Sequence, residues 1–370
     1  MNYKETLFFI GKCLTINHEA HNKVLVEQEL KSKNIDWESI VKVSTAHYVF
    51  PAIYCNLKKA NFLHYLPNDL VEYMKHITDL NRERNQQIIT QAKEINELLL
   101  ANNINPIFLK GTGNLLEGLY DDIAERMVGD IDFLVSKEEY QKTIKTLKTF
   151  GYSKIHTDNY DPLSFKHYPE LVKEGRIAAV EIHKNVLTEE YINEFNYDLI
   201  TKDYLIINGI CFLSFKNQLN LSIIANQIND DGQYFKNIAL RNAYDVFLLS
   251  KKTKVKEAFN NLDRLKKPLE NFIIVSDTIF NSLDSLSYEK SKETANFIRS
   301  FLNYLENSSL GKKEYQKTKN KIFIQKRLSI VYKSIFNKEH RNWVIKRVTD
   351  RKWQKEKLIQ LGLKKPKPDA

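Results

Sequence analysis

The chain has 370 residues, of which 42% are hydrophobic and 28% charged, with few Gly or Pro; this composition excludes a disordered protein and predicts a helix-rich globular one. At about 100–200 residues per domain, the length allows two or three domains. The net charge of +10 is uneven, because the segment from Lys312 onward has about 19 Lys and Arg against about 5 Asp and Glu. The basic character therefore belongs to the C-terminal tail, and the rest of the chain is mildly acidic.

The cysteines and the N-terminus exclude several other classes of protein. Cys13, Cys55 and Cys211 lie far apart and lack metal-ligand spacing, which excludes a disulfide framework and a structural zinc site. The N-terminal apolar run is short and has no small-residue cleavage site, and no run of about 18 uncharged apolar residues occurs. We therefore expect a cytoplasmic protein with no transmembrane segment.

Apolar positions recur at helical spacing through the first 101 residues. After Pro67, a residue suited to a first helical turn, the spacing predicts one long helix that ends near Ala101. The period then changes, because residues 107–109 form a short apolar run between a proline and a glycine, which is typical of a buried strand. Helical spacing returns over residues 112–123, and the sequence DIDFLV (130–135) predicts a second strand.

The next segment predicts one more helix and two more strands. Ser136 followed by Glu139 is a capping-box signature for a helix that ends at Gly151. Residues 176–186 and 209–215 predict the strands, and the pattern after Phe215 is helical almost to the end. We therefore predict an α+β fold with a small mixed sheet. Its expected regions are an N-terminal helical region (1–101), an α/β core (102–215), a C-terminal helical region (216–310) and a basic helical tail (311–370).

Three acidic residues lie inside predicted strands, where an uncompensated charge is costly. Asp130 and Asp132 point to one face of their strand because side chains alternate, and Glu181 lies in a later strand. Two close carboxylates repel unless a proton or a cation lies between them, and Mg²⁺ prefers such carboxylates together with phosphate oxygens. If the strands are neighbours, the three acids form a metal site in which Glu181 can also take a proton from a hydroxyl. The alternative is that the acids lie on solvated strand edges.

A glycine-containing turn precedes the first acidic strand. Gly111 and Gly113 allow a ligand to approach the backbone, and the N–H groups that begin the following helix favour an anion. Thr112 adds a hydroxyl and Lys110 a positive charge, so the turn suits a triphosphate. The P-loop spacing is absent, and the alternative is an ordinary strand-to-helix turn capped by Thr112.

The order of strand, glycine turn, helix, D-x-D strand and later acidic strand resembles the nucleotidyltransferase superfamily that includes DNA polymerase β. More closely, residues 40 to 250 resemble the bacterial family known as uncharacterised nucleotidyltransferases. The matching segments are HYVFPAIYCNL (47–57), FLKG (108–111), Tyr120, Arg126, DIDFLV (130–135), KHYPEL (166–171), VEIHKNV (180–186) and LRNAYDV (240–246). The chain departs from the pattern at Thr112, where Ser is usual, at Glu181, where Asp is more usual, and at Asn226, where His is common.

This resemblance implies a nucleotidyltransferase core that uses Mg²⁺ or Mn²⁺ and a nucleoside triphosphate, such as ATP, as co-substrate. It implies transfer of a nucleoside monophosphate to a hydroxyl acceptor with release of pyrophosphate. The implied metal and catalytic residues are Asp130, Asp132 and Glu181, and the implied triphosphate-binding residues are Lys110, Gly111, Thr112 and Arg126. The alternative for Arg126 is an ion pair with the acidic cluster.

Three further residues are candidates for the cleft: His167, His183 and Arg241. For the two histidines the alternative is a structural, hydrogen-bonded role. For Arg241 the alternative is an intrahelical ion pair with Asp245, four residues further on.

The acceptor is left open by the sequence. A small molecule, a saccharide or a protein is the leading expectation; the alternatives are an RNA (tRNA-type) nucleotidyltransferase and a non-catalytic nucleotide-binding or scaffold protein. The tail interleaves Lys and Arg with Tyr332, Phe336, Trp343 and Trp353. This pattern suits a nucleic acid, an anionic membrane surface or an acidic protein equally, and it also fits a solvated helical face.

Overall fold

The computed structural model describes residues 1–155, 166–187, 189–260, 262–289 and 291–360. The chain forms two compact units, one of residues 1–308 and one that begins at Ser309. The first unit contains a mixed sheet with helices from both ends of the sequence, which confirms the predicted α+β class.

Helices make up the whole N-terminal region of the first unit. Their bounds are α1 (Tyr3–Thr15), α2 (Ala20–Lys31), α3 (Trp37–Ala46), α4 (Phe50–Lys59) and α5 (Asn68–Ala101), with a 3₁₀ turn at Leu63–Tyr65. A capping box of Asn2 and Glu5 begins α1, and Pro67 is the N-cap of α5. The predicted long helix is therefore confirmed, because its apolar spacing continues without a break over 34 residues.

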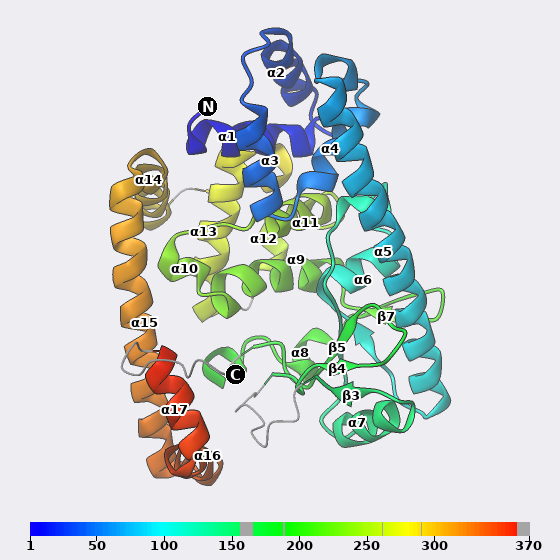
Figure 1. Ribbon diagram of the computed structural model, residues 1–370, viewed down its shortest axis with the longest axis vertical. Helices are drawn as coiled ribbons and strands as arrows, with labels where there is room; N and C mark the ends of the chain where they lie inside the picture. The colour runs from blue at the N-terminus through cyan, green and yellow to red at the C-terminus, as the bar shows by residue number, and fades with distance from the viewer. Residues whose placement is uncertain (156–165, 188, 261, 290, 361–370) are drawn as a thin grey trace. The chain divides into compact units, whose positions relative to one another are not determined.

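A seven-stranded mixed sheet lies at the end of α5, with strand order β3-β4-β5-β2-β1-β7-β6 (Figure 1). The strands are β1 (Ile107–Phe108), β2 (Asp130–Leu134), β3 (Ser153–Lys154), β4 (Leu171–Val172), β5 (Ala179–His183), β6 (Leu205–Ile207) and β7 (Ile210–Phe212). Strand β2 runs parallel to β5 and antiparallel to β1. This pairing places the two acidic strands side by side.

Two helices of the core pack on the strands that carry the acids. Helix α6 (Lys110–Glu117) packs on β1 and β2, and α7 (Tyr140–Thr149) packs on β5. Helix α6 is shorter than predicted because Gly118 adopts a left-handed conformation (φ 80°) and ends it. Ser136 and Glu139 exchange the hydrogen bonds of the predicted capping box, although regular helix begins only at Tyr140.

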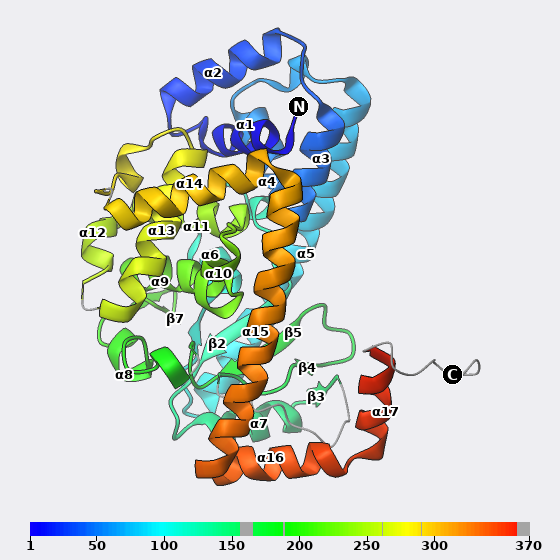
Figure 2. The same cartoon turned by 90° about the vertical axis from the view of Figure 1, so that its left-hand side faces the viewer.

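The second half of the first unit contains further helices. They are α8 (Tyr197–Ile200), α9 (Phe215–Ile224), α10 (Gly232–Phe235), α11 (Leu240–Ser250), α12 (Val255–Ala258), α13 (Asp263–Ile279) and α14 (Lys292–Glu306). A π-helical turn, Ala225–Asn229, follows α9 directly. Both α13 and α14 contact α1, so the two helical regions form one packed layer above the sheet (Figure 2).

Through residue 360, where its description ends, the second unit contains three helices, α15 (Ser308–Phe336), α16 (Lys338–Thr349) and α17 (Arg351–Gln360). Four apolar side chains on α15 are each more than half exposed: Ile324, Leu328, Val331 and Ile335. Their spacing places them on one face of the helix. Across the described parts of both units, no helix has the length and apolar content needed to span a bilayer.

Candidate metal and nucleotide site

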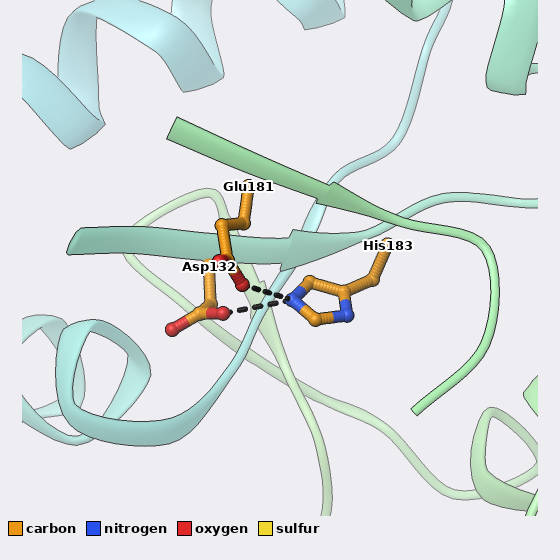
Figure 3. A group of neighbouring side chains, drawn as sticks. All are labelled: Asp132, Glu181 and His183. Carbon is orange, nitrogen blue, oxygen red and sulfur yellow. Dashed lines mark hydrogen bonds and ion pairs between the residues drawn. The ribbon is translucent and has the colours of Figure 1, made fainter. Parts of the chain in front are cut away.

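The register of two parallel strands assembles a cluster of donor groups. In the β2–β5 pairing, Asp132 lies opposite Glu181, and His183 lies two residues further along β5 on the same face as Glu181. Donor atoms of Asp132, Glu181 and His183 all lie within 4.8 Å of one another. Figure 3 shows the His183 ring directed at both carboxylates, with Nε2 2.8 Å from Asp132 Oδ1 and 3.2 Å from Glu181 Oε2.

Lys110 places a positive charge against the same cluster. Its Nζ lies 2.6 Å from Asp132 Oδ1 and 3.8 Å from Glu181 Oε2. The backbone of Lys110 has φ 52°, a left-handed conformation that only glycine adopts without strain. Such strain is typical of functional sites, where the surrounding structure holds the residue in place. The ammonium and the imidazole together compensate the buried carboxylates.

The charges in the cluster shift one another's proton affinities. Burial acts to raise the pKa of Asp132, but the Lys110 charge and the His183 hydrogen bond outweigh it and hold that pKa well below its usual range. For Asp130, burial and the charge of Asp132 raise the pKa to about 6. Burial acts to lower the pKa values of His183 and Lys110, yet their carboxylate partners raise both overall. The cluster is therefore built to hold Asp132 as a carboxylate next to cations.

The donor set suits a divalent cation. Two carboxylates and one imidazole match Mn²⁺ well, and the carboxylate oxygens match Mg²⁺. The sequence prediction named Asp130, Asp132 and Glu181 as ligands, whereas the structure brings Asp132 and Glu181 together with His183. Asp130 begins strand β2 and lines the adjoining pocket. Glu181 and His183 lie two residues apart in the sequence, and this spacing places both side chains on one face of β5.

A pocket of about 560 Å³ opens at the cluster. It is lined by residues of α5, α6, β2, β5, the segments before β2 and before β4, the residue Val186 after β5, the π-helical turn, the first turn of α11 and the loop between α3 and α4. The basic and aromatic residues that line the pocket include Tyr48, Arg84, Lys110, Arg126, Lys166, His167, His183 and Arg241. This excess of cations beside a carboxylate cluster suits a triphosphate together with its metal.

Arg126 has a partner that the sequence analysis did not identify. Its Nε donates to both carboxylate oxygens of Asp245, at 3.0 and 3.1 Å, and its Nη1 donates to the Met127 carbonyl at 2.7 Å. The Tyr120 hydroxyl donates to the same carboxylate at 2.7 Å. The interpretation of Asp245 as the intrahelical partner of Arg241 is therefore wrong, because Asp245 is buried toward Tyr120 and Arg126. Arg126 still lines the pocket, and its contact with phosphate stays a prediction.

The glycine turn has a packing role in this structure. A Cβ atom on Gly113 would lie 2.8 Å from the Phe108 carbonyl oxygen, so this glycine allows α6 to pack closely on β1. The Thr112 hydroxyl donates to the Asp130 carbonyl at 2.6 Å and ties α6 to β2. Gly111 lines the pocket, and Thr112 is not among its lining residues. Binding of triphosphate by Gly111 and Thr112 stays a prediction.

The remaining cleft candidates lie around the cluster. His167 forms an isolated bridge with His183, with ring centroids 5.0 Å apart, and burial lowers its pKa. The guanidinium carbon of Arg241 lies 5.0 Å from the centre of the Tyr48 ring. Tyr48 lies in the segment HYVFPAIYCNL that resembles the family, but the sequence analysis did not identify it as a site residue, because the rest of the pocket is formed by segments far along the chain.

The mixed sheet has acidic residues on two adjacent parallel strands, beside a glycine-containing strand-to-helix turn, which is the arrangement that the sequence resemblance to nucleotidyltransferases leads us to expect. The chain belongs to the family described as uncharacterised nucleotidyltransferase, whose model matches residues 33–272. This match confirms the resemblance drawn from the sequence.

The chain was also compared with solved structures and with curated proteins. Among solved structures, the chain is similar to an antigenic nucleotidyltransferase-like protein from Paracoccidioides brasiliensis, at 15% identity and a TM-score of 0.31. That similarity covers 51% of this chain and 92% of the other. No curated protein matches the chain.

Proposed function

We propose that this protein is a divalent-metal-dependent nucleotidyltransferase that moves a nucleoside monophosphate from a nucleoside triphosphate to a hydroxyl acceptor. The observation that carries the proposal is the buried cluster of Asp132, Glu181 and His183 beside Lys110, at the wall of a 560 Å³ pocket. Family membership supports it. A scaffold protein would gain nothing from burying two carboxylates together, which supports catalysis over a purely structural role.

The metal would be held by Asp132, Glu181 and His183, with Asp130 at the edge of the pocket. Bound Mg²⁺ or Mn²⁺ would neutralise triphosphate charge and lower the pKa of the acceptor hydroxyl. The chain's own cations, Lys110 and Arg126, would orient the triphosphate for in-line attack.

The transfer itself needs one proton acceptor and one leaving group. Glu181 takes the proton of the acceptor hydroxyl, and the acceptor oxygen forms a bond to the α-phosphorus. The bond between the α-phosphorus and the bridging oxygen breaks, and pyrophosphate leaves with that electron pair. The products are a nucleotidylated acceptor and pyrophosphate. The acceptor is a small molecule, a saccharide or a protein hydroxyl, and RNA is the alternative that acceptor screening with tRNA would reveal.

Calorimetric titration of the full chain with ATP, GTP, CTP and UTP, with and without Mg²⁺ or Mn²⁺, tests this function. We expect metal-dependent binding of a nucleoside triphosphate to the wild type and its loss in Asp132→Asn, with Glu257→Gln as a surface control that leaves binding unchanged. Circular dichroism shows whether each variant is folded. Equal binding by wild type and a folded Asp132→Asn, or no binding by the wild type, contradicts the proposal.

We also propose that α15 attaches the protein to an anionic membrane surface. Its exposed apolar face of Ile324, Leu328, Val331 and Ile335 is interleaved with cations such as Arg327 and Lys333. A basic helix with an apolar face suits an anionic lipid surface, whereas a nucleic acid backbone offers that apolar face no partner. Sedimentation of the full chain with phosphatidylserine-containing vesicles, but not with phosphatidylcholine vesicles, is the expected result. Loss of sedimentation in Leu328→Glu/Val331→Glu would support the proposal, and binding of tRNA without binding of vesicles would overturn it.

A further inference from the structure

Tyr48 has a backbone conformation that its own side chain makes unfavourable. It follows the end of α3 with φ 57°. Its N–H donates to the Thr45 carbonyl at 3.0 Å, and the Val49 N–H donates to the Ser44 carbonyl at 2.9 Å. These two bonds form the helix-ending motif in which glycine usually occupies the left-handed position. A tyrosine there is strained, so the helix end alone does not explain this side chain.

The Tyr48 ring contributes little to the core. The residue is 51% exposed, and its hydroxyl has no hydrogen-bond partner among the described residues. The ring instead forms part of the wall of the pocket that contains Lys110 and the acidic cluster. An exposed aromatic ring in a strained backbone, at the wall of a polar pocket, indicates a role in binding.

Arg241 lies against the ring from a different part of the chain. Its guanidinium is 5.0 Å from the ring centre, and its Nε is buried without a hydrogen-bond partner in the described structure. A second contact holds the two segments together, because the backbone N–H of Leu240 donates to His47 Nδ1 at 3.2 Å. Tyr48 and Arg241 therefore form one cation–π pair, contributed by the N-terminal and C-terminal helical regions of the first unit.

We propose that Tyr48, backed by Arg241, is the surface on which the nucleobase of the triphosphate stacks, an inference that rests on the function proposed above. A triphosphate and its metal need charges, which Lys110 and the carboxylates supply, whereas a base needs a flat apolar surface. Every base has a π face, so stacking on Tyr48 favours nucleotides over bare phosphate without selecting one base. The N-terminal helical region is then part of the nucleotide site.

The test combines two Tyr48 variants with a matched control. Tyr48→Gly removes the ring and also removes the backbone strain, and Tyr48→Phe keeps the ring. Lys33→Gly is the control, because Lys33 has a similar left-handed backbone (φ 54°), is exposed and does not line the pocket. For each full-length protein, the melting temperature is measured together with Kd for the four nucleoside triphosphates and for inorganic tripolyphosphate, with Mn²⁺ present.

We expect Tyr48→Gly to melt no lower than wild type and to bind each nucleoside triphosphate about 10-fold more weakly, as base–aromatic stacking predicts. Its Kd for tripolyphosphate should be unchanged, and Tyr48→Phe and Lys33→Gly should bind nucleotides as wild type does. Unchanged nucleotide binding by Tyr48→Gly overturns the inference while leaving the proposed function intact. An equal loss for tripolyphosphate also overturns it, because the ring would then act through the phosphate groups. Absence of nucleotide binding by the wild type overturns both.

Discussion

Replacing Asp245 with Asn should destabilise the first unit by about 3 kcal/mol, because it leaves a buried guanidinium without its counter-charge. The side chains of Arg126 and Asp245 are only 7% and 2% exposed, so water cannot compensate. The carboxylate accepts from Arg126 Nε through both oxygens and from the Tyr120 hydroxyl. An Asn keeps one acceptor and turns the other into a donor, which places the loss at the lower end of about 3–5 kcal/mol for broken buried pairs.

Urea unfolding followed by circular dichroism measures this loss as a shift of the midpoint at constant m, about 1 M for a unit of this size. Glu257→Gln serves as the control, since its exposed pair with Lys254 should contribute below about 1 kcal/mol. The double variant Arg126→Met/Asp245→Leu should recover part of the loss, because it removes the unpaired charge. A loss below about 1 kcal/mol in Asp245→Asn would refute the reasoning, since the guanidinium would then be satisfied without Asp245.

Three more perturbations follow from the structure. Gly113→Ala places a Cβ 2.8 Å from a carbonyl oxygen of β1 and should lower the free energy of unfolding by about 1–3 kcal/mol. Gly129→Ala is the control, because a Cβ there has nothing within 4 Å and should change the free energy of unfolding little. Equal effects of the two variants in thermal unfolding would contradict this reasoning. Burial raises the pKa of Glu125 in the folded protein to about 7 from 4.5. Its protonated side chain therefore stabilises the fold fully below pH 4.5, and about 3 kcal/mol of the free energy of unfolding is lost as the pH rises through 7. Urea unfolding at pH 5 and pH 8 should show this component in wild type and not in Glu125→Gln. Lys110→Met removes the charge that compensates the carboxylates, so its melting temperature should fall in EDTA and rise more than that of wild type when Mn²⁺ is added. An identical Mn²⁺ response in the two proteins would show that Lys110 does not compete with the metal.

Elements with a strong local pattern could be predicted from the sequence. In helix α5, apolar residues recur at helical spacing over 34 residues. In strands β2 and β5, apolar residues precede and follow Asp132 and Glu181. Strands β3 and β4 were not predicted, because each has two residues and no apolar run marks it. Strand β6 was also not predicted, although Asn208 and Gly209 between it and β7 are a hairpin signal. Their pairing comes from the neighbouring strands.

From the sequence, site residues could be predicted only where they lie on one strand or on one face of a strand. Acids inside apolar strands are unusual enough to mark Asp132 and Glu181, and the pairing of β2 with β5 confirms that their strands are neighbours. Contacts between segments that lie far apart in the sequence leave no such unusual pattern in either segment. Local spacing suggested an ion pair within α11, yet the buried carboxylate of Asp245 faces Arg126 from the segment before β2. In the same way, Tyr48 meets its pocket only through the packing of α3 and α4 near α11.

The parallel arrangement of β2 and β5 also bears on when the site forms during folding. Parallel neighbours cannot be joined by a tight hairpin and need a long crossover connection, so Asp132 and Glu181 meet only after a large loop has closed. No short fragment of the chain contains both strands without that connection. Changing the length of the connection should therefore alter how fast the donor cluster assembles, while the strand register keeps its geometry the same.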